Sequence, residues 1–292
     1  MLLHPLILLK SQPSRYGNEF SKKKSNIRAT MSLTFVSLAS GSKGNSTLII
    51  SETTAILVDA GLSYNATVTA LREFGLTPSR LDGVVITHEH SDHIRSAQRL
   101  SEDTKMYIHP LTARAMYERY GAVKNIAHVD DFENGFKIGD IDVEPFRIPH
   151  DAAYPLAYSF ECGGARCSVA TDIGVPTVGV LRNIKDSSLV LLESNHDLDM
   201  LKNGKYPYML KQRILSNNGH LSNDAAAKIV GLLSQDRESR VTKVVLGHIS
   251  ENNNTEQLAF DTVNAMLKKC ENTETELYLA HQYARSEVFE IK

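Results

Sequence analysis

The chain has 292 residues, of which 42% are hydrophobic and 23% are charged, a composition typical of a globular protein. This composition excludes a disordered chain, a collagen and a coiled coil. The formal net charge is −2, but residues 1–30 carry six basic residues and one acidic residue, which leaves about −7 on residues 31–292. An acidic body argues against a protein that coats nucleic acid through bulk charge, and leaves room for a local basic groove.

Residues 1–30 differ from the rest of the chain because they are basic, contain several serines and lack a periodic apolar pattern. We interpret them either as a targeting leader or as a disordered extension upstream of a working start at Met31. The folded domain is expected to span residues 31–292. A clean strand pattern begins at 33–39, directly after Met31, and supports this boundary.

The cysteine content and the absence of long apolar runs concern the location of the protein. The chain contains Cys162, Cys167 and Cys270, an odd and sparse set that is typical of a reducing compartment. No apolar run approaches the roughly 20 residues that a membrane-spanning helix needs. We therefore expect a cytoplasmic protein without a membrane segment.

The predicted elements alternate between strands and helices along the whole domain. Runs rich in Val, Ile and Leu predict strands at 33–39, 47–50, 55–59, 83–87, 106–109, 141–147, 157–162, 166–171, 188–193, 241–246, 276–280 and 286–291. Helical periodicity predicts helices at 64–74, 92–100, 111–120, 222–234 and 255–269. Gly163 and Gly164 predict a hairpin turn. The pattern indicates an α/β fold with two sheets and outer helices.

A histidine-rich motif follows the strand predicted at 83–87, in the segment Thr87-His88-Glu89-His90-Ser91-Asp92-His93. Alternate residues of an extended segment point to the same side, so His88 and His90 can bind one metal ion. Asp92 and His93, where the chain turns into a helix, can bind a second ion nearby. Imidazole and carboxylate groups suit zinc or manganese. A chance polar loop is the alternative, which this density of histidine disfavours.

Further polar residues come directly after predicted apolar strands, at the positions where sites gather in α/β sheets. His150, Asp172 and His248 follow the strands at 141–147, 166–171 and 241–246. Each can be an ordinary loop residue, but together with the histidine motif they complete a site for two metals. Asp59 follows the strand at 55–59, where it either forms a turn or fixes the orientation of a ligand imidazole.

These residues, together with Val58-Asp59-Ala60-Gly61, resemble the metallo-β-lactamase fold superfamily. The resemblance implies an αββα sandwich of two mixed sheets flanked by helices, in which residues 31–292 form a hydrolase domain. It implies that His88, His90 and His150 bind one metal, that Asp92, His93 and His248 bind a second, and that Asp172 bridges them. True metallo-β-lactamases generally carry cysteine or another non-bridging residue in place of Asp172, and flavodiiron proteins carry glutamate in place of His90.

Four further segments resemble the YycJ/WalJ-type bacterial exonucleases. They are 40–46, 191–197, 219–223 and 246–253. This resemblance implies 5′-to-3′ exonuclease activity on DNA. The segments that contain Glu193 and His220 are also similar to ribonuclease Z, where a glutamate and a histidine cooperate in proton transfer. The 76 positions from Asp172 to His248 leave no room for a β-CASP insertion.

We interpret the chain as a dinuclear metal-dependent phosphodiesterase that acts on nucleic acid, with DNA favoured over RNA by the resemblance. Two divalent ions, zinc or manganese, would activate a water. Asp92 would orient that water, and His220, held by Glu193, would protonate the leaving oxygen. The alternatives are a small-molecule hydrolase, acting on a thioester or a cyclic phosphodiester, and a non-catalytic member of the fold. For His220, the alternative is a helix cap or a packed side chain.

Two other segments allow two interpretations each. The loop at 41–44 can form a phosphate-binding nest or a tight turn between strands. The stretch 202–213 combines four basic residues with Tyr206 and Tyr208. It can grip a nucleic acid strand by charge and stacking, or form a solvated face with two core tyrosines.

Overall fold

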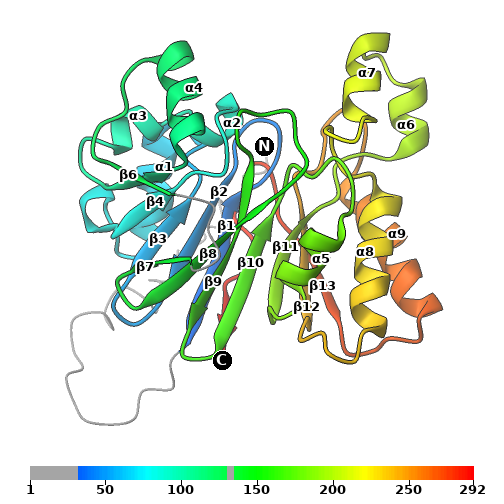
Figure 1. Cartoon of the computed structure of the whole chain (residues 1–292). Helices are drawn as coiled ribbons and strands as arrows, with labels where there is room; N and C mark the ends of the chain where they lie inside the picture. Colours follow the sequence, from blue (N-terminus) through cyan, green and yellow to red (C-terminus); the bar gives the residue numbers. More distant parts are fainter. Residues whose placement is uncertain (1–31, 130–134) are drawn as a thin grey trace, which may run out of the picture.

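The structure is a computed structural model that describes residues 32–129 and 135–292. Two seven-stranded sheets face each other at the centre of the molecule, and helices cover their outer faces (Figure 1). The αββα sandwich predicted from the sequence is confirmed. The proposed leader or extension at 1–30 lies outside the described residues. No helix of the described residues is long and apolar enough to cross a membrane.

The first sheet joins the two ends of the described chain. Its strand order is β14-β1-β2-β3-β4-β5-β6, antiparallel from β14 to β3 and parallel from β3 to β6. The strands are β1 (Leu33–Ala39), β2 (Ser46–Ile50), β3 (Ala55–Val58), β4 (Gly83–Val85), β5 (Met106–Ile108), β6 (Ile126–His128) and β14 (Phe289–Ile291). The helices α1 (Tyr64–Glu73), α2 (Ser91–Ile94), α3 (Ala97–Leu100) and α4 (Pro110–Tyr120) and the short 3₁₀ helix η1 (Pro78–Arg80) lie on this side.

The second sheet has the order β13-β12-β11-β10-β9-β8-β7 and is parallel from β10 to β13. Its strands are β7 (Phe136–Ile138), β8 (Ile141–Arg147), β9 (Leu156–Cys162), β10 (Ala165–Ala170), β11 (Leu189–Glu193), β12 (Lys243–Gly247) and β13 (Glu276–Leu279). The helices α5 (Val178–Ile184), α8 (Asn223–Gln235) and α9 (Glu256–Lys269) cover it. The helices α6 (Leu198–Asn203) and α7 (Tyr208–Ile214) rise above the strand ends (Figure 1).

Three apolar layers hold the sandwich together. The layer between the sheets includes Phe35, Tyr158 and Phe160, all fully buried. A second layer packs α5, α8 and α9 against one sheet, and a third packs α1, α3 and α4 against the other. Central strands are therefore buried on both faces, which explains why they appear in the sequence as continuous apolar runs.

Short elements account for the differences from the sequence prediction. The helix predicted at 92–100 is two short helices, α2 and α3, and β6, β7, α5, α6 and α7 were not predicted. Elements of three to seven residues show too little periodicity to stand out. The hairpin turn is confirmed, because Gly163 and Gly164 have φ angles of 59° and 94°. The tight turn at 41–44 is confirmed as well, because the Gly44 N–H donates to the Gly41 carbonyl at 3.0 Å.

Candidate metal centre

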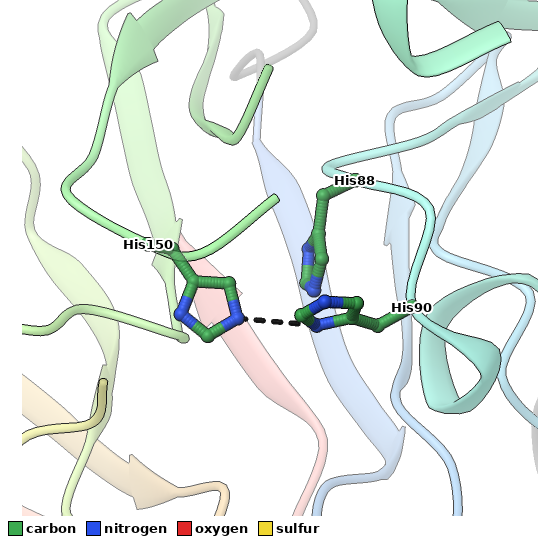
Figure 2. Close-up of side chains that lie close together, drawn as sticks. All are labelled: His88, His90 and His150. Atoms are coloured by element: carbon green, nitrogen blue, oxygen red, sulfur yellow. Dashed lines mark hydrogen bonds between the residues drawn. The ribbon is translucent and has the colours of Figure 1, made fainter. Parts of the chain in front are cut away.

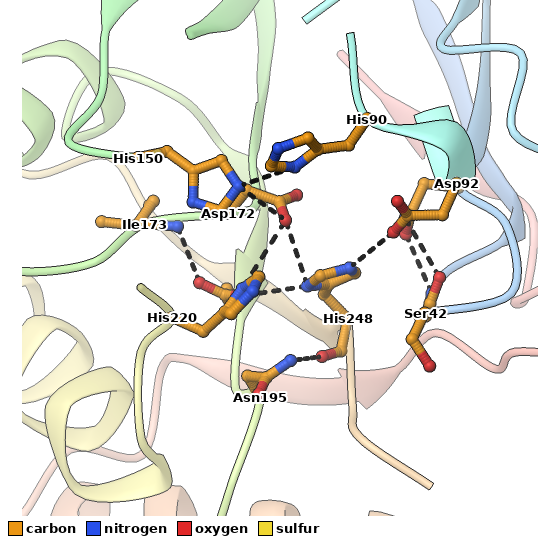
Figure 3. Close-up of polar contacts among 12 residues, drawn as sticks. Ser42, His90, Asp92, His150, Asp172, Ile173, Asn195, His220 and His248 are labelled. Carbon is orange, nitrogen blue, oxygen red and sulfur yellow. Dashed lines mark hydrogen bonds and ion pairs between the residues drawn. The ribbon is translucent and has the colours of Figure 1, made fainter. Parts of the chain in front are cut away.

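The strand-end residues singled out in the sequence meet at one edge of the sandwich (Figure 3). The parallel strands β3 and β4 end at this edge in one sheet, and the parallel strands β10, β11 and β12 end there in the other. The facing sheets bring the two sets of strand ends together. Residues that are far apart in the sequence therefore surround one small space.

The backbone turns sharply at three of these strand ends. Asp59, Asp172 and His248 have φ angles of 62°, 61° and 54°, which is the left-handed region. Residues other than glycine rarely adopt this conformation, which costs on the order of 1–3 kcal/mol and clusters at functional sites. The turn redirects each side chain from the end of its strand into the space between the sheets.

Three imidazoles form the first half of the centre, and we call His88, His90 and His150 site A. Figure 2 shows the three rings converging on one space, and each pair is arranged edge to face. His150 Nε2 lies 3.2 Å from His90 Nδ1. Their potential ligand atoms all lie within 4.8 Å of one another. Two outer nitrogens have partners: Thr87 Oγ1 lies 3.0 Å from His88 Nδ1, and Gly219 O accepts from His150 Nδ1 at 3.0 Å. Such contacts orient imidazoles for metal binding.

A carboxylate and two imidazoles form the second half, and we call Asp92, His93 and His248 site B. Asp92 Oδ2 lies 3.4 Å from His248 Nε2 and 3.6 Å from His93 Nε2. Again the outer nitrogens are engaged: Asp59 Oδ2 lies 2.8 Å from His93 Nδ1, and Glu193 Oε1 lies 2.8 Å from His248 Nδ1. Asp59 therefore contacts an imidazole, as the second of the two sequence interpretations predicted.

Asp172 lies between the two sites. Its Oδ2 atom is 3.1 Å from His93 Nε2 and its Oδ1 atom is 3.7 Å from His150 Nε2. Among the described residues, the buried His88 Nε2 atom makes no hydrogen bond, and the buried Asp172 Oδ2 atom makes none beyond its ion-pair contact with His93. A buried imidazole nitrogen without a hydrogen-bond partner is costly unless a cation binds it. The donor set and these two atoms fit a pair of divalent ions.

The charges of the centre divide between its two halves. Burial lowers the pKa of His88 well below its usual range and lowers the pKa values of His90 and His150, which favours the neutral, metal-binding form of each ring. In site B burial acts in the same direction, but the carboxylates around His248, first among them Asp172, outweigh it and raise its pKa to about 10. Site B thus has the stronger attraction for positive charge.

Beside the centre, Glu193 links two histidines. Its Oε1 atom lies 2.8 Å from the Nδ1 atoms of both His220 and His248, while Oε2 accepts the Ile173 N–H at 2.7 Å and the Leu221 N–H at 3.0 Å. Burial opposes ionisation, but the hydrogen bonds and charges of the two histidines lower the pKa of Glu193 to about 2. The Glu193 side chain is fully buried and that of His220 is 18% exposed. Nε2 is therefore the His220 nitrogen left for a substrate.

Several supporting residues were not recognised as such in the sequence. Asn45 Nδ2 donates to Asp92 Oδ2 at 3.3 Å, Ser40 Oγ accepts from the His248 N–H at 2.8 Å, and Asn195 Nδ2 donates to the His248 carbonyl at 2.8 Å. All three lie in segments that carry the exonuclease resemblance. Their residue types have no characteristic spacing, so only that resemblance could have indicated them.

The basic stretch at 202–213 covers the end of α6, the loop 204–207 and most of α7, which stand beside the centre. The prediction of two core tyrosines is wrong, because Tyr208 is 71% exposed and Tyr206 is only partly buried. Arg213 forms a two-pronged ion pair with Asp151, next to His150. Tyr206 in the loop, together with Leu210, Arg213 and Ile214 of α7, lines the cavity at the centre.

Comparison with known proteins agrees with this geometry. The family model of the metallo-beta-lactamase superfamily matches residues 39–206. The chain belongs to the metallo-beta-lactamase superfamily. The metallo-beta-lactamase fold protein YhfI from Bacillus subtilis has a similar structure, with a TM-score of 0.66 and 16% identity over 89% of this chain and 99% of its own. The short form of human tRNase Z has a TM-score of 0.54 and 17% identity, covering 87% of this chain and 98% of its own.

Two relatives with higher sequence identity align with most of this chain. The exodeoxyribonuclease YycJ of Bacillus anthracis is 36% identical over 245 residues, which are 82% of this chain and 90% of the relative. The exodeoxyribonuclease WalJ of Streptococcus pneumoniae is 38% identical over 232 residues, which are 77% of this chain and 85% of the relative. The resemblance to this branch inferred from the sequence is confirmed.

Proposed function

We propose that the protein is a metal-dependent exonuclease that shortens DNA from its 5′ end. Relatives named exodeoxyribonuclease support the nuclease activity and the DNA substrate. One observation carries the proposal: the buried Glu193 positions His220 at the edge of a space that seven metal-binding side chains surround. That combination suits the cleavage of a phosphodiester, which needs both charge neutralisation and a proton for the leaving group.

Sites A and B would each hold one divalent ion, zinc or manganese, and Asp172, which lies between the two sites, would serve both. The donors are imidazoles and carboxylates, which both metals accept. When bound, the two ions neutralise the phosphate charge and acidify a water molecule. The outer contacts from Asp59 and Glu193 keep the donor nitrogens of His93 and His248 turned toward site B.

Protein side chains perform the proton transfers. Asp92 is partly exposed at the cleft, where it orients the attacking water as well as serving as a ligand. His220 donates a proton from Nε2 to the 3′ oxygen as the bond between that oxygen and phosphorus breaks. Glu193 remains ionised and holds Nδ1 of His220, so that Nε2 stays directed at the leaving oxygen.

The three cysteines support a reducing location such as the cytoplasm. Cys162, Cys167 and Cys270 are all free thiols, and the first two are buried. Exposed structural disulfides are typical of oxidising compartments. We therefore propose that the enzyme is cytoplasmic and that it meets its DNA substrate there.

End-labelled DNA tests the proposal. We expect a 5′-labelled strand to release a labelled mononucleotide at once, and a 3′-labelled strand to shorten as a ladder. Metal-chelated protein is the control, and RNA of the same sequence, a thioester and a cyclic phosphodiester are assayed in parallel. Hydrolysis of a thioester or cyclic phosphodiester without cleavage of DNA would contradict the exonuclease in favour of a small-molecule hydrolase.

A further inference from the structure

A second cavity lies against the loop that carries His248, and we call it the β13 pocket. The ends of β1, β12 and β13 and the start of α9 surround it. Its volume is about 340 Å³, at the lower end of the range for pockets that bind small molecules. Among the described residues, Ser250 alone lines both this pocket and the cavity at the metal centre. The β13 pocket is therefore a separate space that adjoins the centre.

The wall of the β13 pocket combines apolar surface with negative charge. Ile249, Ala280 and Ala284 supply apolar surface. Glu251 and Glu256 supply two carboxylates, and the described part of the chain places no lysine or arginine in the lining. A pocket of this charge repels the phosphates of a nucleic acid, so its occupant is not the DNA substrate.

The two carboxylates of the β13 pocket have different partners. Glu256 Oε1 lies 2.8 Å from Nδ1 of His281, an imidazole that also lines the pocket. Glu251 Oε1 accepts a hydrogen bond from the Tyr283 hydroxyl at 2.5 Å, and within 32–129 and 135–292 Glu251 forms no ion pair. This bond holds the Tyr283 side chain beside Glu251, although Tyr283 is 76% exposed. A carboxylate beside an exposed aromatic ring attracts an organic cation through charge and through the face of the ring.

The β13 pocket also contacts the backbone that positions site B. Ser40 lines the pocket, and its Oγ atom accepts the His248 N–H at 2.8 Å. Ser250 donates its N–H to Asn195 O at 2.9 Å, and Asn195 Nδ2 donates to the His248 carbonyl at 2.8 Å (Figure 3). A cation in the pocket and a divalent ion at site B would therefore lie on two sides of one thin wall, where they would repel each other.

We propose that the β13 pocket binds a small organic cation with an apolar body, and that its occupation weakens metal binding at site B. The body packs against Ile249, Ala280 and Ala284. The ammonium group lies beside Glu251 and the Tyr283 ring. Such a ligand is an effector that lowers the activity of the enzyme without entering the cavity where the substrate reacts. The binding site itself is independent of the proposed exonuclease function, and only the effect on that activity rests on it.

Three indole compounds that differ in charge test the recognition of a cation. Tryptamine is positive, tryptophol is neutral and indole-3-acetate is negative, while the apolar body is the same. We expect calorimetry on the metal-loaded protein to show that tryptamine binds at least about tenfold more tightly than tryptophol, and that indole-3-acetate binds most weakly. Equal affinities for the three compounds would overturn the recognition of charge.

Variants of two surface residues test the location. Glu251→Gln should weaken tryptamine binding at least about tenfold and leave tryptophol binding unchanged, because only the charge is lost. Tyr283→Ala should weaken binding of tryptamine, and Tyr283→Phe should restore most of it, because the ring is retained. Glu52→Gln removes a carboxylate from an exposed position outside the pocket and is the control. Wild-type affinity for tryptamine in Glu251→Gln would show that the cation does not bind in this pocket.

Comparison of metal-loaded and chelated protein tests the link to site B. We expect the Kd of tryptamine to be about fivefold or more lower in chelated protein, and saturating tryptamine to raise the Kd of zinc by the same factor, because coupling between two sites is reciprocal. Tryptophol carries no charge and should bind both forms equally. In Glu251→Gln, tryptamine at the same concentration should leave the Kd of zinc unchanged. A tryptamine Kd that does not depend on metal would overturn the link between the pocket and site B.

These measurements follow binding and not cleavage. Protein that binds tryptamine as expected but cleaves no DNA would remove the exonuclease function and leave the pocket assigned. Protein that cleaves DNA but does not bind tryptamine would overturn the pocket and leave the exonuclease function. The two proposals therefore fail separately.

Discussion

A single buried carboxylate organises two histidines with different environments. Glu193 Oε1 accepts a hydrogen bond from His248, which is almost fully buried within site B, and from His220, which reaches the cleft. As a result, His248 directs Nε2 toward Asp92, whose Oδ2 atom is 3.4 Å away. Their positions differ: His248 can share a metal with Asp92 and His93, whereas His220 is within ligand distance of Asp172, Glu193 and His248 and is not grouped with Asp92 or His93. The proposed roles differ accordingly, with His248 as a ligand of site B and His220 as the proton donor.

Replacing His220 by alanine should separate proton donation from metal binding. We expect His220→Ala to keep both metals and to slow DNA cleavage by about 10² to 10⁴, the usual contribution of a general acid. A nitrophenyl phosphodiester, whose leaving group needs no proton, should be affected far less. Both rates are measured with metal content, and exposed His128→Ala is the control. Loss of one metal would mean that His220 is a ligand, and wild-type rates on both substrates would remove the proton donor.

Asp172→Ala should reduce metal binding most directly, because Asp172 lies between sites A and B. We expect the variant to hold fewer than two metals per chain and to lose nearly all activity. Elemental analysis of protein purified without added metal gives the content. Asp103→Ala removes an exposed carboxylate and should change neither quantity. Two bound metals and full activity in Asp172→Ala would contradict the bridging role.

At the scale of elements, the centre depends on loops that pass close to one another between strand ends. The turn after β3 meets both the loop before β2 and the histidine motif. The Gly61 N–H donates to Asn45 O at 2.9 Å, and the Ala60 N–H donates to His93 O at 2.7 Å. A Cβ atom at Gly61 would lie only 1.7 Å from Asp92 O and 2.4 Å from Asn45 N. Backbone atoms cannot move aside as a flexible side chain can, so glycine is required for this contact.

Gly61→Ala should therefore displace the backbone of Asp92 while every proposed ligand residue keeps its side chain. We expect a loss of about 1–3 kcal/mol in stability from overpacking, together with weaker binding of metal at site B. Denaturant unfolding and metal titration measure the two effects. Gly179→Ala, in α5, meets only Thr177 Oγ1 at 3.7 Å and should leave both unchanged. Wild-type metal affinity in Gly61→Ala would show that this close approach does not position site B.

At the scale of the whole molecule, the candidate metal centre lies where the two sheets meet, so metal binding there would be coupled to the stability of the sandwich. Site A takes His88 and His90 from the first sheet's side and His150 from the second. Site B takes Asp92 and His93 from the first and His248 from the second. Each ion would therefore join the two halves of the sandwich.

Chelation should lower the melting temperature markedly. A site occupied at a hundred times its Kd contributes about 2.7 kcal/mol, so two sites contribute about 5 kcal/mol. For a domain of this size that corresponds to a loss of roughly 10 °C or more. Calorimetry with and without chelator measures the shift, and readdition of zinc or manganese should reverse it. An unchanged melting temperature after verified metal removal would show that the ions do not join the sheets.

The sequence by itself determined the class of fold and predicted which side chains meet at the candidate centre. The His88–His93 motif lies in one short segment, so it can be recognised as a candidate set of metal ligands without knowledge of the fold. Continuous apolar runs likewise predict buried strands directly. Strand-end residues such as His150 and Asp172 needed only the rule that sites gather at the ends of parallel strands.

Only the tertiary structure decided how these groups work together. Glu193 serves both His220 and His248, and Lys43 and Tyr120 share a cavity wall, although each of these residues lies on a different element. No spacing along the chain encodes such contacts, because they arise when two separately built sheets stack and their strand ends meet. Which imidazole nitrogen remains free, and which side chains line the same cavity, are consequences of that packing.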